Sequence, residues 1–329
     1  MQFPVPQKNL LRMLSDGQCH SGAYLARALQ VSRTAVWAQV HDLQGLGLQV
    51  NALSGKGYRL QQALELLEES QIRAALDVQV SDLVTLELHD LLDSTNTQLN
   101  ERARQGAAPG TVCIAELQTA GRGRLGRAWH SPFAGNFCLS VLWHYPDHQA
   151  IAGLSLAVGV AIVRALKQVG IEDVGLKWPN DVLWQGRKLG GILMEVTGEI
   201  HGKHAVIVGI GLNRHIPAAR AESIDQAWVD LEQITGGKTP SRNRLMAGLL
   251  NQLVPLLQTY ADLGLAAYLD EWRRYHVFDG RNVVLRQGER TIRGVVTGVS
   301  AAGLLRLDCE GEGVREFSSG DVSLRPDHA

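Results

Sequence analysis

The stretch of the chain with the clearest chemical character is a glycine-rich loop that carries three arginines. It spans residues 121–129 and reads Gly-Arg-Gly-Arg-Leu-Gly-Arg-Ala-Trp. Glycine lets backbone N–H groups approach an anion closely, and arginine adds permanently charged forks that match phosphate and carboxylate oxygens. The indole of Trp129 is suited to stack on a nucleotide base when such a loop closes. The loop therefore predicts binding of an anionic substrate.

The same loop contains the G-x-G-x-x-G spacing of dinucleotide-binding folds, and Gly121 and Gly126 have the spacing of a P-loop. A dinucleotide fold needs a helix to begin at the last glycine, but Pro132 follows in a segment that cannot open one. A P-loop needs Lys followed by Ser or Thr, and Arg127-Ala128 stands there instead. Both familiar interpretations fail, which leaves a flexible cationic flap.

The body that must position this loop alternates strands and helices. Strands are predicted over residues 112–116, 136–145, 182–184, 188–196 and 204–209. Residues 151–169 are apolar almost all round, which predicts a buried helix, and residues 185–187 form a hairpin signal. Several hairpins beside one buried helix predict an α+β domain with a largely antiparallel sheet.

The first 64 residues have the pattern of a winged helix-turn-helix. Helices are predicted over residues 7–15, 22–30 and 32–44, followed by an alternating hairpin over 48–60. The third helix begins at a capping serine and presents polar and aromatic side chains on one side, while the hairpin tip is basic. The predicted DNA contacts are Ser32, Arg33, Thr34, Trp37, His41 and Lys56. Because the helix face offers one arginine only, modest affinity and dimeric binding to two half-sites are expected.

The last part of the chain is predicted to be two helices followed by short strands. The helices span residues 241–263, with an interruption at Pro255, and 265–275. The strands are predicted over 282–286, 291–299, 304–309 and 314–318, separated by glycine turns. We therefore expect three domains, over residues 1–64, 65–275 and 276–329, and a small β barrel as the last.

Composition and charge exclude several classes of protein. With 45% hydrophobic and 20% charged residues among 329, wholesale disorder is excluded, and a net charge of −1 excludes coating of nucleic acid by overall charge. Residues 1–63 nevertheless hold six basic and two acidic side chains. The four cysteines are scattered without metal-ligand spacing, and the longest apolar run is too short for a bilayer. We expect a cytoplasmic, multidomain protein with no membrane segment and no metal site.

Three further motifs, Asp-Ser-Thr-Asn at 93–96, Lys-Trp-Pro-Asn-Asp at 177–181 and Arg-Lys-Leu-Gly-Gly-Ile at 187–192, accompany the loop. In this order they resemble the motifs of the biotin–protein ligases. With the winged helix in front, the chain from about Leu10 to Leu324 resembles the bifunctional bacterial type, at once biotin ligase and biotin-operon repressor. The resemblance implies a class II aminoacyl-tRNA-synthetase-like catalytic domain and an SH3-like C-terminal barrel.

The resemblance also implies a two-step reaction and its residues. Biotin and ATP, with Mg²⁺, give biotinyl-5′-AMP, and the acyl group passes to a lysine of the biotin carboxyl carrier protein. The implied catalytic residues are Lys188, Arg124 and Asp181, the last with an open choice between orienting Lys188, orienting the acceptor amine and binding magnesium. The implied nucleotide-binding residues are Arg124, Arg127, Trp129, Lys188 and Asn213. The implied biotin-binding residues are Ser94, Thr95, Asn96, Gln118, Gly121, Arg122, Gly123, Arg124, Lys188, Gly191, Gly209 and Gly211.

The implied macromolecular partners are the carrier protein and operator DNA of biotin-synthesis genes, with a homodimer forming when the adenylate is bound. The family's adenylate-covering segment corresponds to Gly211-Leu212-Asn213 and the loop up to Trp228, which Arg214, His215 and Arg220 make more basic than hydrophobic. Two alternatives stay open: a ligand-sensing repressor without ligase activity, and a lipoate–protein ligase. The charged set of Arg124, Lys188 and Asp181 argues against the first alternative, since binding alone would not require it. The Gly-Arg loop, the barrel and the winged helix argue against the second.

Overall fold

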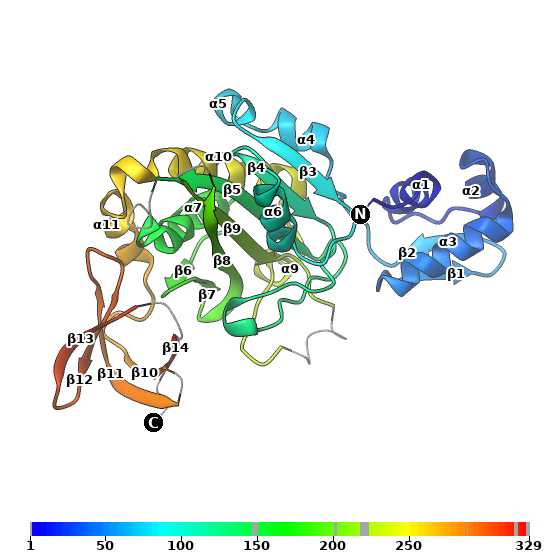
Figure 1. Ribbon diagram of the computed structural model, residues 1–329. Helices are drawn as coiled ribbons and strands as arrows, with labels where there is room; N and C mark the ends of the chain where they lie inside the picture. The colour runs from blue at the N-terminus through cyan, green and yellow to red at the C-terminus, as the bar shows by residue number, and fades with distance from the viewer. Residues whose placement is uncertain are drawn as a thin grey trace.

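The protein consists of three parts arranged in chain order (Figure 1). The computed structural model describes residues 2–146, 151–200, 203–217, 224–287, 289–318 and 322–326. In Figure 1 the N-terminal part lies at one end, a large mixed sheet with its helices in the middle, and a small sheet at the other end. This confirms the predicted α+β multidomain organisation. No helix in these ranges is long and apolar enough to cross a bilayer.

The N-terminal part is a helix-turn-helix with a two-stranded wing. It comprises α1 (Val5–Leu14), α2 (Gly22–Ala28), α3 (Arg33–Gly45), β1 (Val50–Leu53) and β2 (Gly57–Leu60). Helices α2 and α3 begin at the serines predicted to cap them, because Ser21 accepts a hydrogen bond from the Tyr24 N–H and Ser32 from the Ala35 N–H. Their apolar stripes close a core around Leu10, Leu25 and Val36.

The central sheet has seven strands in the order β3-β4-β5-β9-β8-β7-β6. Only the pair β3 and β4 is parallel, so the prediction of a largely antiparallel sheet is confirmed. The strands are β3 (Thr85–His89), β4 (Thr111–Ala115), β5 (Asn136–Tyr145), β6 (Val174–Lys177), β7 (Asp181–Trp184), β8 (Arg187–Ile200) and β9 (Lys203–Asn213).

Helices cover both faces of this sheet. On one face the buried helix α7 (Leu154–Gln168) joins α10 (Arg242–Leu263) and α11 (Ala266–Tyr275) in the main core. On the other face α6 (Thr95–Arg104) packs Leu99 and Ala103 on alternate residues of β4, β5 and β9. Three short helices, α4 (Glu69–Ala74), α5 (Val78–Ser81) and α9 (Leu231–Thr235), complete this part.

The prediction that Pro255 interrupts its helix is wrong. Helix α10 runs through Pro255 without a break. Proline removes one backbone hydrogen bond and disfavours a helix interior, but tertiary packing can override that preference. Here Leu253, Val254, Leu256 and Leu257 on either side are all buried in the main core, and this packing holds the helix together.

The C-terminal part is an antiparallel sheet of five strands in the order β13-β12-β11-β10-β14. Its strands are β10 (Asn282–Gln287), β11 (Arg290–Val299), β12 (Leu305–Cys309), β13 (Gly313–Phe317) and β14 (Val322–Pro326). Four of them were predicted within two residues at each end, and β14 was not. Val283, Leu285 and Leu305 belong to the main core, so this small sheet packs on the central part.

The N-terminal part is joined to the body by specific contacts as well as by the chain. The Phe3 ring stacks on the Phe133 ring at 5.8 Å between centroids, and the Lys8 ammonium lies 2.9 Å from an Asp90 oxygen. Phe133 belongs to the segment that follows the glycine-rich loop. The docking surface of the N-terminal part therefore lies close in sequence to the predicted substrate flap.

The linker that follows the wing is also held to the body by hydrogen bonds. The Glu65 carboxylate accepts hydrogen bonds from the Ser241 hydroxyl and the Arg242 N–H at the start of α10. The fully buried Arg242 guanidinium lies 2.6 Å from an oxygen of Glu116, whose other oxygen accepts from the Leu67 N–H. Removing one partner of a buried ion pair is strongly destabilising, so these contacts hold the linker firmly to the start of α10.

Candidate active site

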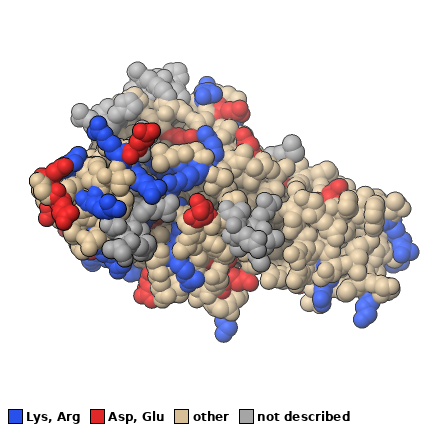
Figure 2. Space-filling view, turned by 90° about the horizontal axis from the view of Figure 1, so that it is seen from below, with Lys and Arg blue, Asp and Glu red and all other residues tan. Residues whose placement is uncertain are grey.

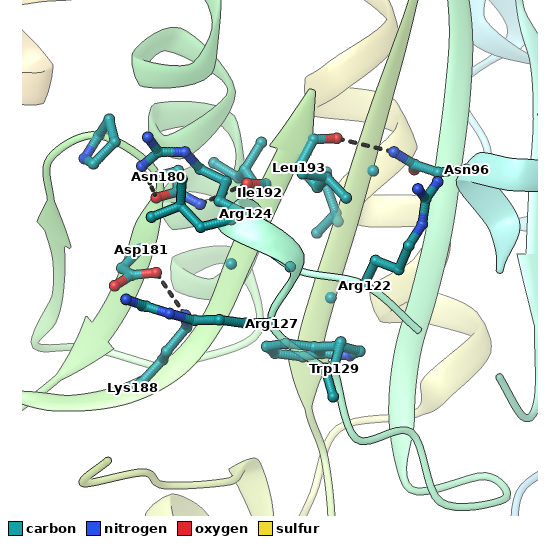
Figure 3. A pocket seen from close by; sticks show the side chains of 18 of the residues that line it. Asn96, Arg122, Arg124, Arg127, Trp129, Asn180, Asp181, Lys188, Ile192 and Leu193 are labelled. Atoms are coloured by element: carbon teal, nitrogen blue, oxygen red, sulfur yellow. Dashed lines mark hydrogen bonds and ion pairs between the residues drawn. The ribbon is translucent and has the colours of Figure 1, made fainter. Parts of the chain in front are cut away.

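One cavity brings together the predicted loop and all three polar motifs (Figure 3). It lies over β8 and β9, between the start of α6, the Lys177–Asp181 turn and the loop 121–129. The predicted residues that line it are Ser94, Thr95, Asn96, Gln118, Arg122, Gly123, Arg124, Arg127, Trp129, Asp181, Lys188, Gly191, Gly209 and Gly211. Gly121 and Asn213, which were also predicted, lie outside this lining.

Figure 3 shows the two sides of the cavity. Asn96 and Arg122 lie on one side, and Asp181, Arg127 and Lys188 on the other. The loop passes between the two groups, and Trp129 lies at its far end. We call the part lined by Ser94, Thr95, Asn96 and Gln118, beside which Arg122 lies, the neutral end, and the part around Asp181 and Lys188 the charged end.

The neutral end is a connected set of hydrogen bonds. The Thr95 N–H donates to Gln118 Oε1 at 2.8 Å, and the Ser140 hydroxyl donates to Asn96 Oδ1 at 2.6 Å. Ser94 caps α6, which places all three residues of the Ser-Thr-Asn motif on the first turn of that helix. Both donors and acceptors are present here, as a neutral polar ring such as a cyclic urea requires.

Two glycines of β9 are required by close packing in the cavity floor. A Cβ at Gly209 would lie 2.1 Å from Asn96 Oδ1, and one at Gly211 would lie 2.5 Å from Trp129 Cε2. Real side chains cannot approach so closely, so these positions must be glycine for Asn96 and Trp129 to lie flat on the strand. Gly209 and Gly211 thus make room for two side chains of the protein, Asn96 and Trp129, in the cavity floor.

The loop is tied to itself across its base. The Trp129 N–H donates to the Gly121 carbonyl at 2.8 Å, and the Gly123 N–H donates to the Arg127 carbonyl at 2.7 Å. At its tip Leu125 has φ 58°, a left-handed conformation that costs a residue with a Cβ about 1–2 kcal/mol. Strain of this kind persists where the surroundings fix it, and it is frequent in ligand-binding loops.

The charged end is built around Asp181, which lies between two lysines. Its Oδ1 is 2.7 Å from the Lys188 ammonium and its Oδ2 is 3.2 Å from the Lys177 ammonium. Burial alone would raise the pKa of Asp181, but the two ammonium groups outweigh it and hold that pKa below the usual range. The carboxylate is therefore ionised and both of its oxygens are engaged.

Several residues of the site escaped the sequence analysis. Asn180 lies in a recognised motif, and its Oδ1 accepts from Arg124 Nη1 at 3.3 Å. Ser140 on β5 and Glu195 on β8, the strands on either side of β9, hold the Asn96 amide, and Gln226 lines the cavity. Ser140 and Glu195 lie inside strands, where nothing in the local sequence separates a supporting side chain from an ordinary strand residue.

The segment expected to cover an adenylate lies beside Lys188 in part. The Lys188 N–H donates to the Ala227 carbonyl, and the Asn213 amide donates to the Val229 carbonyl at 3.1 Å. Asn213 is buried and so packs this segment against the strand. His215 pairs with Glu232 at 2.8 Å, and Arg220 lies outside the described residues.

The predicted DNA-contacting residues lie on one surface of the N-terminal part. All six of them are exposed, five along the start and outer side of α3 and Lys56 at the tip of the wing. Trp37 is 60% exposed and stacks on His41 at 5.8 Å with nearly parallel rings. Figure 2 shows basic side chains at the outer end of this part, away from the body. Ser32 also serves as the cap of α3.

Comparison with known proteins agrees with this three-part arrangement. Residues 6–59 match the family model described as HTH domain, residues 88–213 match the biotin/lipoate A/B protein ligase family, and residues 280–325 match the biotin protein ligase C terminal domain. A solved biotin protein ligase from Aquifex aeolicus in complex with biotin and ATP superposes with a TM-score of 0.65 and 31% identity, covering 74% of this chain and 99% of that one.

Curated relatives match over more of the chain. The biotin--[acetyl-CoA-carboxylase] ligase of Mycobacterium tuberculosis is 36% identical over 78% of this chain and 95% of its own length. The bifunctional ligase/repressor BirA of Escherichia coli is 36% identical over 98% of this chain and 97% of its own length. The resemblance seen in the sequence motifs is thereby confirmed, and the chain belongs to the BirA family of bifunctional ligase/repressor proteins.

Proposed function

We propose that this chain activates biotin as biotinyl-5′-AMP at the cavity and transfers it to a lysine of the biotin carboxyl carrier protein of acetyl-CoA carboxylase. The observation that carries the proposal is the convergence of the cationic loop, the Asp181–Lys188 pair and the Ser94–Asn96 polar end on one cavity. A polar ring fits the neutral end, and a carboxylate with phosphates fits the charged end.

In the first step a carboxylate oxygen of biotin attacks the α-phosphorus of ATP, and the bond from that phosphorus to pyrophosphate breaks. Two anions must approach each other, so fixed positive charge in a closed site lowers the barrier. We assign this role to Lys188, which is only 17% exposed, and to Arg124 on the loop. Arg127 and Trp129 complete the nucleotide side of the cavity.

We assign Asp181 to the positioning of Lys188. A carboxylate whose pKa is held low by two ammonium groups is a poor proton acceptor, which disfavours its use as the base for the acceptor amine. Its short contact with Lys188 instead fixes the ammonium at the point where the carboxylate and the α-phosphate meet.

The same residues offer Mg²⁺ no set of protein ligands. Both oxygens of Asp181 are paired with lysines, and Asn180 Oδ1 accepts from Arg124. In the part of the chain that the structure describes, no group of three His, Cys, Asp or Glu side chains converges on a metal position. Mg²⁺ would therefore enter as its complex with the ATP phosphates, and we assign no step to it.

In the second step the acceptor lysine attacks the acyl carbon of the adenylate, AMP leaves, and the amine loses a proton. The mixed anhydride must survive in water until the carrier arrives, which requires the flap 121–129 to cover it. The loop contributes all three of its arginines and Trp129 to the lining of the cavity.

The N-terminal part supports a second activity of the same chain. We propose that the surface around Arg33, Trp37 and Lys56 binds operator DNA of biotin-synthesis genes. A homodimer, formed when the adenylate is bound, would span two half-sites. Gel-shift titration of such a promoter with and without biotin plus ATP tests this, and equal binding in both conditions would remove the switch.

Incubation of the full chain with ATP, an apo-carrier domain and either radiolabelled biotin or lipoate tests the ligase. We expect label on the carrier from biotin alone. Label from lipoate would favour a lipoate–protein ligase, which shares the matched catalytic family but not the matched C-terminal domain. Tight biotin binding without any pyrophosphate release would favour a sensor without ligase activity.

A further inference from the structure

Glu195 lies beside the cavity and contacts residues that line it, but it does not itself line the cavity. It belongs to β8, two residues beyond Leu193, which lines the cavity. Its side chain is 26% exposed and points towards the start of α6 and the loop. No role follows for it from the motifs recognised in the sequence.

The Glu195 carboxylate joins the two flanks of the neutral end. Arg122 Nη2 donates to Oε1 at 3.0 Å, which connects β8 to the glycine-rich loop. The amide of Asn96 donates to Oε2 at 2.8 Å and that of Asn100 to the same oxygen at 3.2 Å, which connects β8 to α6. One carboxylate therefore holds a loop arginine and a cavity amide at once.

The loop depends on such anchors for its position over the cavity. The hydrogen bonds across its base fix its internal shape but not its angle to the sheet, and Leu125 keeps it strained. Arg122 fastens one side of the loop to β8 through Glu195, and Arg124 reaches Asn180 on the opposite side. Figure 3 shows the two arginines directed to opposite sides of the cavity.

We propose that Glu195 is a positioning residue that holds the flap 121–129 closed over the adenylate, acting through Arg122. The inference rests on the proposed ligase function. The Arg122–Glu195 pair is half exposed, which limits its strength, but hydrogen bonds from Asn96 and Asn100 orient the carboxylate and reduce the entropic cost of the pairing. Its loss frees the flap while leaving Lys188 and Asp181 in place.

The test is the lifetime of bound biotinyl-AMP in the isosteric variant Glu195→Gln of the full chain. Radiolabelled adenylate is formed on the enzyme, chased with unlabelled adenylate, and its release followed. We expect release to be at least about fivefold faster than in the parent chain. The maximal rate of pyrophosphate release at saturating biotin should change by less than about twofold, because the groups that act on the α-phosphate are untouched.

Glu87→Gln is the matched control. Glu87 pairs with Arg102 at 2.7 Å with 18% and 40% side-chain exposure, close to the values for Glu195 and Arg122, but it lies away from the cavity. We expect this variant to release adenylate at the parental rate. Thermal unfolding of both variants shows whether each remains folded, and Glu195→Asp, which keeps the charge but shortens the reach, should give intermediate release.

The pathway of the effect is tested by a double-mutant cycle with Arg122→Met. If Glu195 acts through Arg122, the double variant releases adenylate no faster than the faster single variant. Multiplicative effects, or an unchanged adenylate lifetime in Glu195→Gln, would overturn the proposal. A parent chain that forms no biotinyl-AMP at all would refute the ligase function itself, which is a distinguishable result.

Discussion

The ammonium of Lys188 lies 2.7 Å from Asp181 Oδ1, across two adjacent strands whose residues line the cavity. Asp181 begins β7 and Lys188 is the second residue of β8, where it pairs with Leu183, so the two-residue turn between the strands brings the Lys188 side chain within reach of Asp181. The pair is held on the sheet, while the loop 121–129 has to be positioned over it. The charged groups at the centre of the site are therefore fixed by the sheet, whereas the loop that covers them can change its position.

Substitution Lys188→Ala is expected to abolish adenylate formation without unfolding the protein. The ammonium is the fixed cation closest to Asp181, and no other side chain in the pair of strands can replace it. Loss of such an electrostatic stabiliser lowers kcat by about 10²–10³ or more. Pyrophosphate release with biotin and ATP measures the effect, and a variant that releases pyrophosphate at the normal rate would refute the assigned role.

Substitution Asp181→Asn is expected to impair both stability and adenylation. It leaves two mostly buried ammonium groups, those of Lys177 and Lys188, without their counter-charge, which costs about 3–5 kcal/mol in comparable buried pairs. Chemical denaturation measures this loss. Asp270→Asn serves as the control, because Asp270 is 93% exposed and its pair with Arg273 should contribute little. Equal effects of the two substitutions would contradict the positioning role.

Substitution Arg124→Gly is expected to slow adenylate formation without preventing it, since Lys188 remains, and to loosen the bound adenylate. Arg124 lines the cavity and contacts Asn180 across it, so its loss opens the flap. Biotinyl-AMP should then escape and label bystander lysines, which streptavidin blotting of a mixture of carrier and unrelated proteins detects. Arg281→Gly, at an exposed arginine ahead of β10, should keep labelling confined to the carrier. Unchanged selectivity in Arg124→Gly would count against a clamp.

Substitution Gly209→Ala is expected to raise the KM for biotin strongly. The new methyl group would meet Asn96 Oδ1 at 2.1 Å and displace the amide from the neutral end of the cavity. Gly248→Ala in α10 is the control, since its nearest neighbour lies 4.0 Å away and alanine favours the helix. Initial rates over a range of biotin concentrations separate KM from kcat, and an unchanged KM would exclude Asn96 from biotin recognition.

The protein should lose stability as the pH falls from about 6.5 to 4 because of His276. Burial lowers the pKa of this histidine to about 4, and it stacks on Trp272 at 4.5 Å between centroids. In that range the unfolded chain binds a proton that the folded chain does not, so this contribution is complete above pH 6.5 and lost below it, on the order of 3 kcal/mol.

The variant His276→Phe keeps the ring against Trp272 and removes the titration. Its stability should therefore depend less on pH between about 6.5 and 4 than that of the parent, measured by urea unfolding at several pH values. His41→Phe, at an exposed histidine, should retain the parental profile. Parallel profiles for His276→Phe and the parent would show that the buried imidazole does not control acid sensitivity.

Much of the fold could be predicted because its central elements follow simple patterns. Strand β5 agrees residue for residue, since Asn136–Tyr145 is a long, mostly buried strand inside the sheet and is dense in apolar residues such as Phe137, Leu139 and Val141. The two strands that were missed, β3 and β6, are the edges of that sheet. An edge strand is short and partly exposed, so its hydrophobic pattern is weak.

The residues of the candidate site likewise fall into those that the sequence predicted and those that it did not. Residues in contiguous motifs, such as Ser94–Asn96 and the loop arginines, were found because their type and order are visible along the chain. Glu195 was not, because its partners Arg122 and Asn96 are 73 and 99 residues away in sequence. Sequence analysis left three roles open for Asp181. We could propose one of them, the positioning of Lys188, only from the contacts of Asp181 with both Lys177 and Lys188. Pairings of this kind are set by strand order, which a single sequence does not specify.

The buried attachment of the linker has a consequence for the geometry of transcriptional control. Because Glu65 and Glu116 fasten residues 65–67 to the first turn of α10, the N-terminal part is not joined to the body by a flexible linker. In the proposed homodimer, a flexible linker would let the two N-terminal parts reach a range of half-site separations, whereas a fixed attachment allows a single separation. Operator spacing is then a property of the whole assembled protein, and an inserted base pair should be tolerated poorly.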